Sequence, residues 1–253
     1  MQRIIAFVLA AVMVLSATAA FAFTPDDKEL TSRLGKAYGA LQSWRVEMSF
    51  PEFPDVRATV WQHGPRWRQE WRSASMSAEA VAVGSVSGVG AACPSDFPLP
   101  PTLFWNMPGQ VAYWKSAGVD NATGGFGFAG DHPSLIIGAD PGDESKPQVW
   151  LDNETMALLR VRLASSGGFM DIRFRQYSFK GGFQVPEAGE VQVPSGRTVE
   201  FALEWTDLNG AADPALYDAS AIRSAAMTGD CPAPPAPFDT LAVGLSAVPV
   251  RQE

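Results

Sequence analysis

Apolar and polar residues alternate along this chain with two different periods. Between residues 25 and 42 the apolar positions recur every three or four residues, as Leu30, Leu34, Tyr38 and Leu41 show. The segment opens with a Thr-Pro-Asp-Asp sequence, which is typical of a helix start. We therefore expect an amphipathic helix whose apolar stripe packs against the rest of the fold.

From residue 44 the period becomes two, which predicts strands with one apolar face. Turn residues at 51–55 and 64–65 separate three such strands, and a weaker fourth is expected at 81–86. This is the pattern of an antiparallel meander. The apolar-face positions are Val46, Met48 and Phe50, then Val56, Ala58 and Val60, then Trp67, Gln69 and Trp71.

Residues 92–130 interrupt the alternation with prolines and a glycine-rich stretch, and two short helices are expected there, at 103–107 and 110–117. This insertion is too apolar to be a free linker, so we expect it to cover part of the fold. Strands are predicted again afterwards, and the Ala- and Pro-rich tail from 219 to 253 is expected to be irregular. The second set of expected strands is 134–139, 148–151, 157–164, 169–177, 189–193 and 197–207.

The first 22 residues fit a cleavable signal peptide, which implies export to the periplasm. Arg3 is followed by an apolar run over 4–15 and by an Ala-Phe-Ala sequence that ends at Ala22. The run is shorter than the ~20 residues of a membrane span, although an uncleaved anchor is the alternative. No later segment is apolar for long enough to span a membrane.

Composition narrows the classes of partner and cofactor. The formal net charge is −8, with no run of Lys or Arg, which disfavours nucleic acid because its binders neutralise phosphates with cations. Cys93 and Cys231 are expected to form a disulfide in an oxidising compartment, the alternative being two free thiols. Two Cys and two distant His have no metal-ligand spacing, so neither a metal nor another cofactor is expected.

The residues of known catalytic constellations are sparse, and we therefore expect no enzyme. No Gly-x-Ser-x-Gly sequence surrounds a serine, and His63 and His132 have no partners that the sequence specifies. An envelope hydrolase is the weakest alternative. Arg66 and Arg68 lie on the polar face of a predicted strand, where they are candidates for binding an acidic partner; the alternative is an ordinary exposed face.

The order of these elements resembles the periplasmic outer-membrane lipoprotein carrier (LolA-like) family over roughly residues 25–218. The resemblance rests on VWQHGPRWRQEW at 60–71, on VWLD at 149–152 followed by LLRV at 158–161, and on FRQY at 174–177 with VP at 185–186 and EVQV at 190–193.

The resemblance implies an α+β, mostly antiparallel fold over 23–218: an incomplete, curved β-barrel with the N-terminal helix and short inserted helices as a lid. It implies a carrier that binds lipid or an acylated lipoprotein in an apolar cavity, for transport to the outer membrane, with docking proteins at both membranes as candidate partners. The alternative function is a regulatory or interaction module of the envelope with a similar half-barrel. The residues predicted to line the cavity are Trp44, Met48, Trp67, Trp71, Phe174, Phe201 and Trp205; the alternative for each is plain core packing.

Overall fold

The computed structural model describes residues 25–74, 80–85, 88–91, 105, 110–165, 167–211, 213–218 and 236–245. The predicted signal peptide, both cysteines and the predicted helix at 103–107, apart from Trp105, lie outside these ranges.

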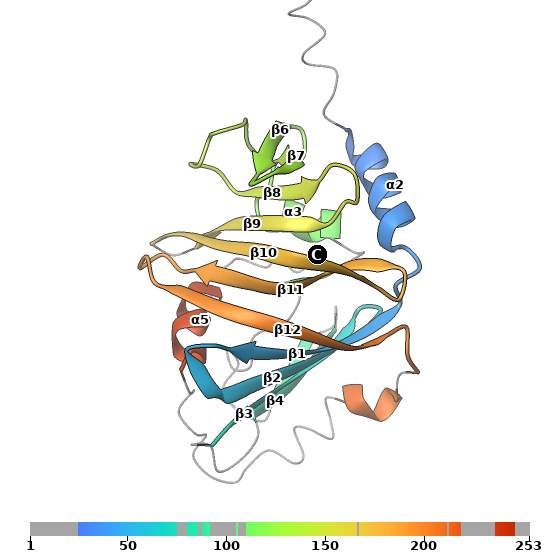
Figure 1. The fold of residues 1–253 in the computed structure, drawn as a ribbon, viewed down its shortest axis with the longest axis vertical. Coiled ribbons are helices and arrows are strands. Elements are labelled where there is room, and N and C mark those ends of the chain that lie inside the picture. Colours follow the sequence, from blue (N-terminus) through green and yellow to red (C-terminus); the bar gives the residue numbers. More distant parts are fainter. Residues whose placement is uncertain are drawn as a thin grey trace, which may run out of the picture.

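One antiparallel sheet dominates the described chain, and it runs from top to bottom of Figure 1. Its twelve strands follow the order β5-β4-β3-β2-β1-β12-β11-β10-β9-β8-β7-β6, so β1 and β12 join the two meanders. The end strands β5 and β6 are not paired with each other, and the sheet is open. The strands are β1 (Ser43–Phe50), β2 (Phe53–His63), β3 (Arg66–Ser73), β4 (Ala80–Ser85), β5 (Gly88–Ala91), β6 (Gly124–Ala129), β7 (His132–Ile137), β8 (Gln148–Asp152), β9 (Leu158–Ser165), β10 (Gly168–Lys180), β11 (Phe183–Gln192) and β12 (Thr198–Leu208).

The predicted N-terminal helix is α2 (Asp27–Tyr38), which lies beside the sheet in Figure 1. The Asp26 side chain accepts a hydrogen bond from the Glu29 amide at 2.8 Å, and this N-cap satisfies one of the free amides of the first turn. Leu30, Leu34 and Tyr38 are buried, as their spacing predicts. The other described helices are α3 (Gln110–Ser116), the 3₁₀ turn η2 (Pro214–Tyr217) and α5 (Phe238–Leu245).

One apolar core joins the inner face of the sheet, which we call the concave face, to α2, α3 and α5. Two local features adapt the strands to it. Gly189 leaves room for the ring of Phe201, since a Cβ there would lie 2.4 Å from the Phe201 Cζ. Gln176 has a φ of 57° and is not among the β10 residues that pair with β11, although the register is the same on either side of it. Phe174 belongs to the core, and Tyr177, three positions later, packs against it.

The structure confirms the open antiparallel fold with an N-terminal helix, and it adds four elements that the sequence pattern did not predict, one of which is the 3₁₀ turn η2. Strand β5 was missed, and β6 lies where a glycine-rich break was expected. Residues 238–245 of the tail are not irregular: they form α5, and its Phe238 and Leu241 are fully buried.

Candidate functional site

A small apolar cavity lies against the concave face, where β1, β2, β10 and β12 come together. Its volume is about 20 Å³, which is room for roughly one water-sized group. None of the lining side chains is ionisable. They are Trp44, Val46, Met48, Val60, Trp105, Phe174, Leu203 and Trp205.

Trp105 is the one lining residue that comes from outside the sheet. It is 3% exposed, and its ring centre lies 4.9 Å from that of Trp205, 5.6 Å from that of Trp44 and 6.1 Å from that of Tyr38 on α2. All three contacts are edge-to-face, a favoured geometry for aromatic pairs. Trp105 therefore lies between α2 and the sheet.

The three tryptophans that line this cavity each carry one indole N–H group. The Trp205 Nε1 donates to the Pro186 carbonyl at 2.6 Å. Within the part of the chain that the structure describes, the buried Nε1 atoms of Trp44 and Trp105 have no hydrogen-bond partner. A buried donor without a partner costs about 1–3 kcal/mol. The site thus combines apolar walls with tryptophans of which two carry a buried indole N–H without a partner among the described residues.

The predicted lining residues divide into two groups. Four of them, Trp44, Met48, Phe174 and Trp205, surround the cavity. The other three, Trp67, Trp71 and Phe201, are buried but are not among its lining residues. The sequence pattern missed Trp105, although the apolar character of the insertion was the signal that this segment covers part of the sheet.

At a second place on the concave face, α5 packs on the sheet. The ring of Phe238 lies 5.1 Å from that of Trp71, and Phe50 stacks on Trp71 at 5.5 Å. The Arg197 side chain donates to the Thr240 hydroxyl at 2.7 Å. The end of the described chain is therefore part of the core.

The two arginines predicted to bind a partner contact the chain itself. Arg68 donates to Glu70 at 2.6 Å and to the Leu216 carbonyl at 2.9 Å. The Arg66 guanidinium lies 5.3 Å from the centre of the Tyr217 ring. Both side chains thus hold η2 against β3, and their binding to a partner stays a prediction.

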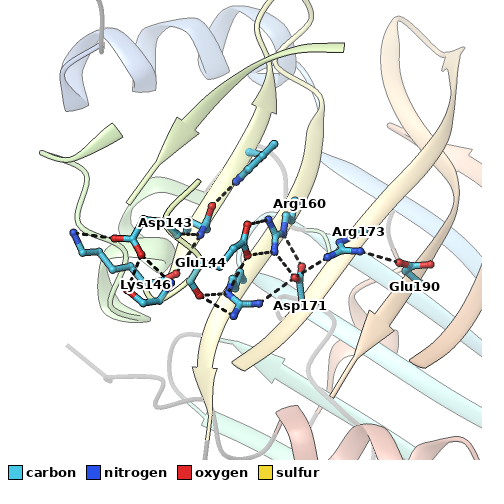
Figure 2. Close-up of polar contacts among 11 residues, drawn as sticks. Asp143, Glu144, Lys146, Arg160, Asp171, Arg173 and Glu190 are labelled. Carbon is cyan, nitrogen blue, oxygen red and sulfur yellow. Dashed lines mark hydrogen bonds and ion pairs between the residues drawn. The ribbon is translucent and has the colours of Figure 1, made fainter. Parts of the chain in front are cut away.

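The opposite face of the sheet, which we call the convex face, carries a chain of ion pairs, shown in Figure 2. At its centre Arg160 donates to Asp171 at 2.8 and 2.5 Å and to Glu144 at 2.8 and 2.6 Å. The chain continues through Arg173 to Glu190, whose carboxylate is 3.5 Å from the Arg173 guanidinium.

These arginines set the protonation of the two carboxylates. Burial by itself would raise the pKa of Asp171, but the hydrogen bonds of Arg160 and the charges of Arg173 and Arg162 outweigh it, and the pKa is lowered. The pKa of Glu144 is lowered chiefly by its hydrogen bonds to Arg160. Both groups are charged at neutral pH. This network ties the 140–147 loop to β9 and β10.

A larger hollow of about 590 Å³ lies where the start of α2 meets residues 119–122. Its rim is charged, and Lys115 pairs there with Asp27, which lowers the pKa of that carboxyl. Charged, solvent-open walls do not suit an apolar ligand. We therefore place the candidate site at the smaller cavity.

Two solved structures are similar to this chain. A LolA superfamily protein from Nitrosomonas europaea is 15% identical, with a TM-score of 0.48, and the alignment covers 77% of this chain and 98% of the other. A DUF1329 family protein from Desulfovibrio piger is 12% identical, with a TM-score of 0.37, and the coverage is 76% and 96%. No protein-family model matches the chain, and no curated protein matches it.

The described residues offer little for catalysis. The His132 Nδ1 lies 3.3 Å from Asp152, but the neighbouring Ser134 is fully buried and donates to the His132 carbonyl at 2.8 Å. That hydroxyl is not placed as a nucleophile. In the described ranges no cluster of His, Cys, Asp and Glu could hold a metal ion. Nor is any helix in these ranges both long and apolar enough to cross a membrane.

Proposed function

We propose that this protein is a periplasmic carrier that binds an acyl chain of a lipid or lipoprotein between the concave face and Trp105, for transport to the outer membrane. The observation that carries the proposal is the cavity under Trp105, which is lined by aromatic and aliphatic side chains without a charge. An acyl chain buried there gains about 0.8 kcal/mol for each methylene removed from water.

The protein as described is closed, because a cavity of about 20 Å³ cannot hold an acyl chain. Trp105 is the side chain whose departure would enlarge it, since it belongs neither to the sheet nor to a described helix. Its edge-to-face contacts are apolar and its Nε1 has no partner among the described residues. A ligand that fills the same space replaces these contacts with others of the same kind, so the exchange is reversible.

The Nε1 atom of Trp44 indicates how the ligand head would be held. It is a buried donor with no partner in the described chain. The carbonyl of an acyl ester or amide accepts such hydrogen bonds, whereas a bare hydrocarbon does not. Within the lipids, this favours acylated molecules.

The compartment and the transport role are supported by the sequence. The predicted signal peptide gives an exported protein, and an exported protein that meets lipid in an aqueous compartment must shield it. The resemblance to the LolA-like family supports carriage of a lipoprotein in particular.

The alternative function is a regulatory or interaction module that uses the same half-barrel without transport. The small volume of the cavity favours this alternative, because an interaction module needs no space for a ligand inside its core.

The two functions are separated by Trp105→Ala, which removes the side chain that fills the site. A carrier with this substitution is expected to bind a fluorescent fatty-acid probe at least tenfold more tightly than the unchanged protein. Trp61→Ala is the matched control, because Trp61 lies on the convex face between Arg45 and Arg68. It is expected to leave probe affinity unchanged.

Native mass spectrometry of the protein purified from lipid-containing cells provides the second measurement. A carrier is expected to retain lipid, and more of it after Trp105→Ala. If neither the unchanged protein nor Trp105→Ala retains lipid, and Trp105→Ala binds no probe, the carrier function is excluded. The interaction module then remains.

A further inference from the structure

Strand β6 (Gly124–Ala129) forms an open edge of the sheet. It pairs with β7 alone among the described strands. The two are joined by the two-residue turn Gly130-Asp131, in which Gly130 has a φ of 60°. In such a hairpin the residues that flank the turn, Ala129 and His132, exchange backbone hydrogen bonds.

The register places the free backbone groups of β6. Because hydrogen-bonded and free positions alternate along an antiparallel edge strand, Gly127 and Gly125 bond to β7 like Ala129. The N–H and C=O groups of Phe126 and Phe128 therefore point away from the sheet. Their side chains are also accessible, at 43% and 70% exposed.

Strand β6 packs closely on its neighbours, and its edge lacks the residues that usually prevent further strand pairing. A Cβ on Gly127 would lie 2.8 Å from Ile136, and one on Gly125 would lie 2.8 Å from Pro141, so the strand packs closely on its neighbours. Edge strands are commonly protected from further pairing by charged residues or proline. The sequence GGFGFA has neither.

We propose that β6 binds an extended segment of a partner protein, which adds to the sheet as a further strand. The backbone groups of Phe126 and Phe128 would pair with the segment, and their rings would cover its apolar side chains.

The charges around β6 indicate the chemistry of that segment. Asp120 and Asp140 lie near the start of β6 and Asp131 lies in the turn at its end, and all three are exposed. The nearby Lys146 is already paired with Asp143, at 3.5 Å. We therefore expect a segment whose apolar centre is flanked by Lys or Arg.

The same charges disfavour a second copy of this chain as the occupant. Antiparallel pairing of two β6 strands would bring Asp131 of each copy near Asp120 and Asp140 of the other, and parallel pairing would align like ends. Both arrangements oppose carboxylates. An anionic membrane surface is disfavoured for the same reason.

The test uses a dye-labelled peptide, Lys-Lys-Val-Thr-Val-Thr-Val-Lys-Lys, and a matched peptide with Glu in place of Lys. The lysine peptide is expected to bind at least tenfold more tightly than the glutamate peptide. Phe126→Pro removes an edge N–H that β7 does not use, and it is expected to weaken binding at least tenfold. Phe126→Ala keeps that N–H and is expected to weaken peptide binding less than Phe126→Pro does.

Two further measurements keep the test decisive if Phe126→Pro does not fold. Hydrogen exchange at the amides of Phe126 and Phe128 is expected to slow when the peptide binds, and Phe128→Lys is expected to weaken binding of the lysine peptide. Equal binding of both peptides, or unchanged exchange at these amides, would overturn the proposal.

Two other occupants, a second copy of this chain and a membrane, would give different results. A dimer in sedimentation that Phe126→Pro converts to a monomer would assign β6 to a second copy instead. Phe-dependent binding to vesicles of phosphatidylglycerol would assign it to a membrane. Phe126→Pro is expected to leave fatty-acid probe binding unchanged. Failure of the strand-addition proposal can therefore be distinguished from failure of the carrier proposal.

Discussion

The two faces of strand β10 show the contrast within this molecule. Met170, Ile172 and Phe174 belong to the apolar core. The residues between them, such as Asp171 and Arg173, form the ion pairs of the convex face. One strand thus separates a nonpolar site from a charged network.

The two faces differ in how strongly they fix side-chain positions. Arg160 and its carboxylates depend on distances and angles, because a buried charge that loses a partner is heavily penalised. Apolar contacts are not directional, so one apolar group can replace another at little cost. The carrier that we propose, which would exchange a side chain for a lipid chain on one face, would benefit from a rigid opposite face.

The largest expected effect is on the convex face. Arg160→Met leaves Asp171, whose side chain is 2% exposed, without its main partner. We expect a loss of about 3–5 kcal/mol in the free energy of unfolding, measured by urea denaturation. Adding Asp171→Leu is expected to recover part of this loss, because the buried charge, which would then be paired only with Arg162 and Arg173, is gone. A loss below about 1 kcal/mol for Arg160→Met would show that the network contributes little.

The next effect is on the concave face, at α5. Phe238→Ala is expected to cost about 3 kcal/mol, near the lower end for a buried Phe, because the ring is fully buried against Trp71. The same denaturation measurement checks it. Phe179→Ala is the matched control, since that ring is 70% exposed and its removal is expected to have little effect. Equal stability of the two variants would mean that α5 does not belong to the core.

The sequence predicted the elements whose apolar spacing is regular. Helix α2 was predicted from Leu30, Leu34 and Tyr38, and the longer strands from strict alternation. The sequence pattern could not predict β6, because glycine at 125 and 127 suits a turn as well as a strand. In the structure glycine is required at both positions, because Pro141 and Ile136 leave too little room for a Cβ.

The site was predicted only in part, for a similar reason. Alternation places a residue on a face but not at a position on that face. It therefore found Trp44, Met48, Phe174 and Trp205 without separating them from Trp71, which packs under α5. Trp105 has no periodic context, and Phe238 lies in a segment whose composition is typical of an irregular tail.

A smaller effect is expected on acidification. The pKa values of Asp171 and Glu144 are lowered in the folded protein, so the folded state binds fewer protons than the unfolded state. Their contribution is present above the unfolded pKa values, about 3.9 and 4.3, and is lost as the pH falls below them. Urea midpoints at pH 6 and pH 3 are expected to differ more for the unchanged protein than for Asp171→Asn. If the midpoint changes equally in the two proteins, the acid sensitivity arises from groups other than Asp171.

The smallest expected effect is at the exposed end of the same network. Arg175 lies 2.8 Å from Glu200, but both side chains are nearly half exposed. Water and salt weaken such a pair, so Arg175→Ala is expected to cost less than about 1 kcal/mol. It is also expected to leave fatty-acid probe affinity unchanged. A cost comparable to that of Arg160→Met would mean that the ion pairs act as one cooperative unit, and that burial of each pair does not determine its contribution. The convex face would then be rigid across its whole width, from the 140–147 loop to β12.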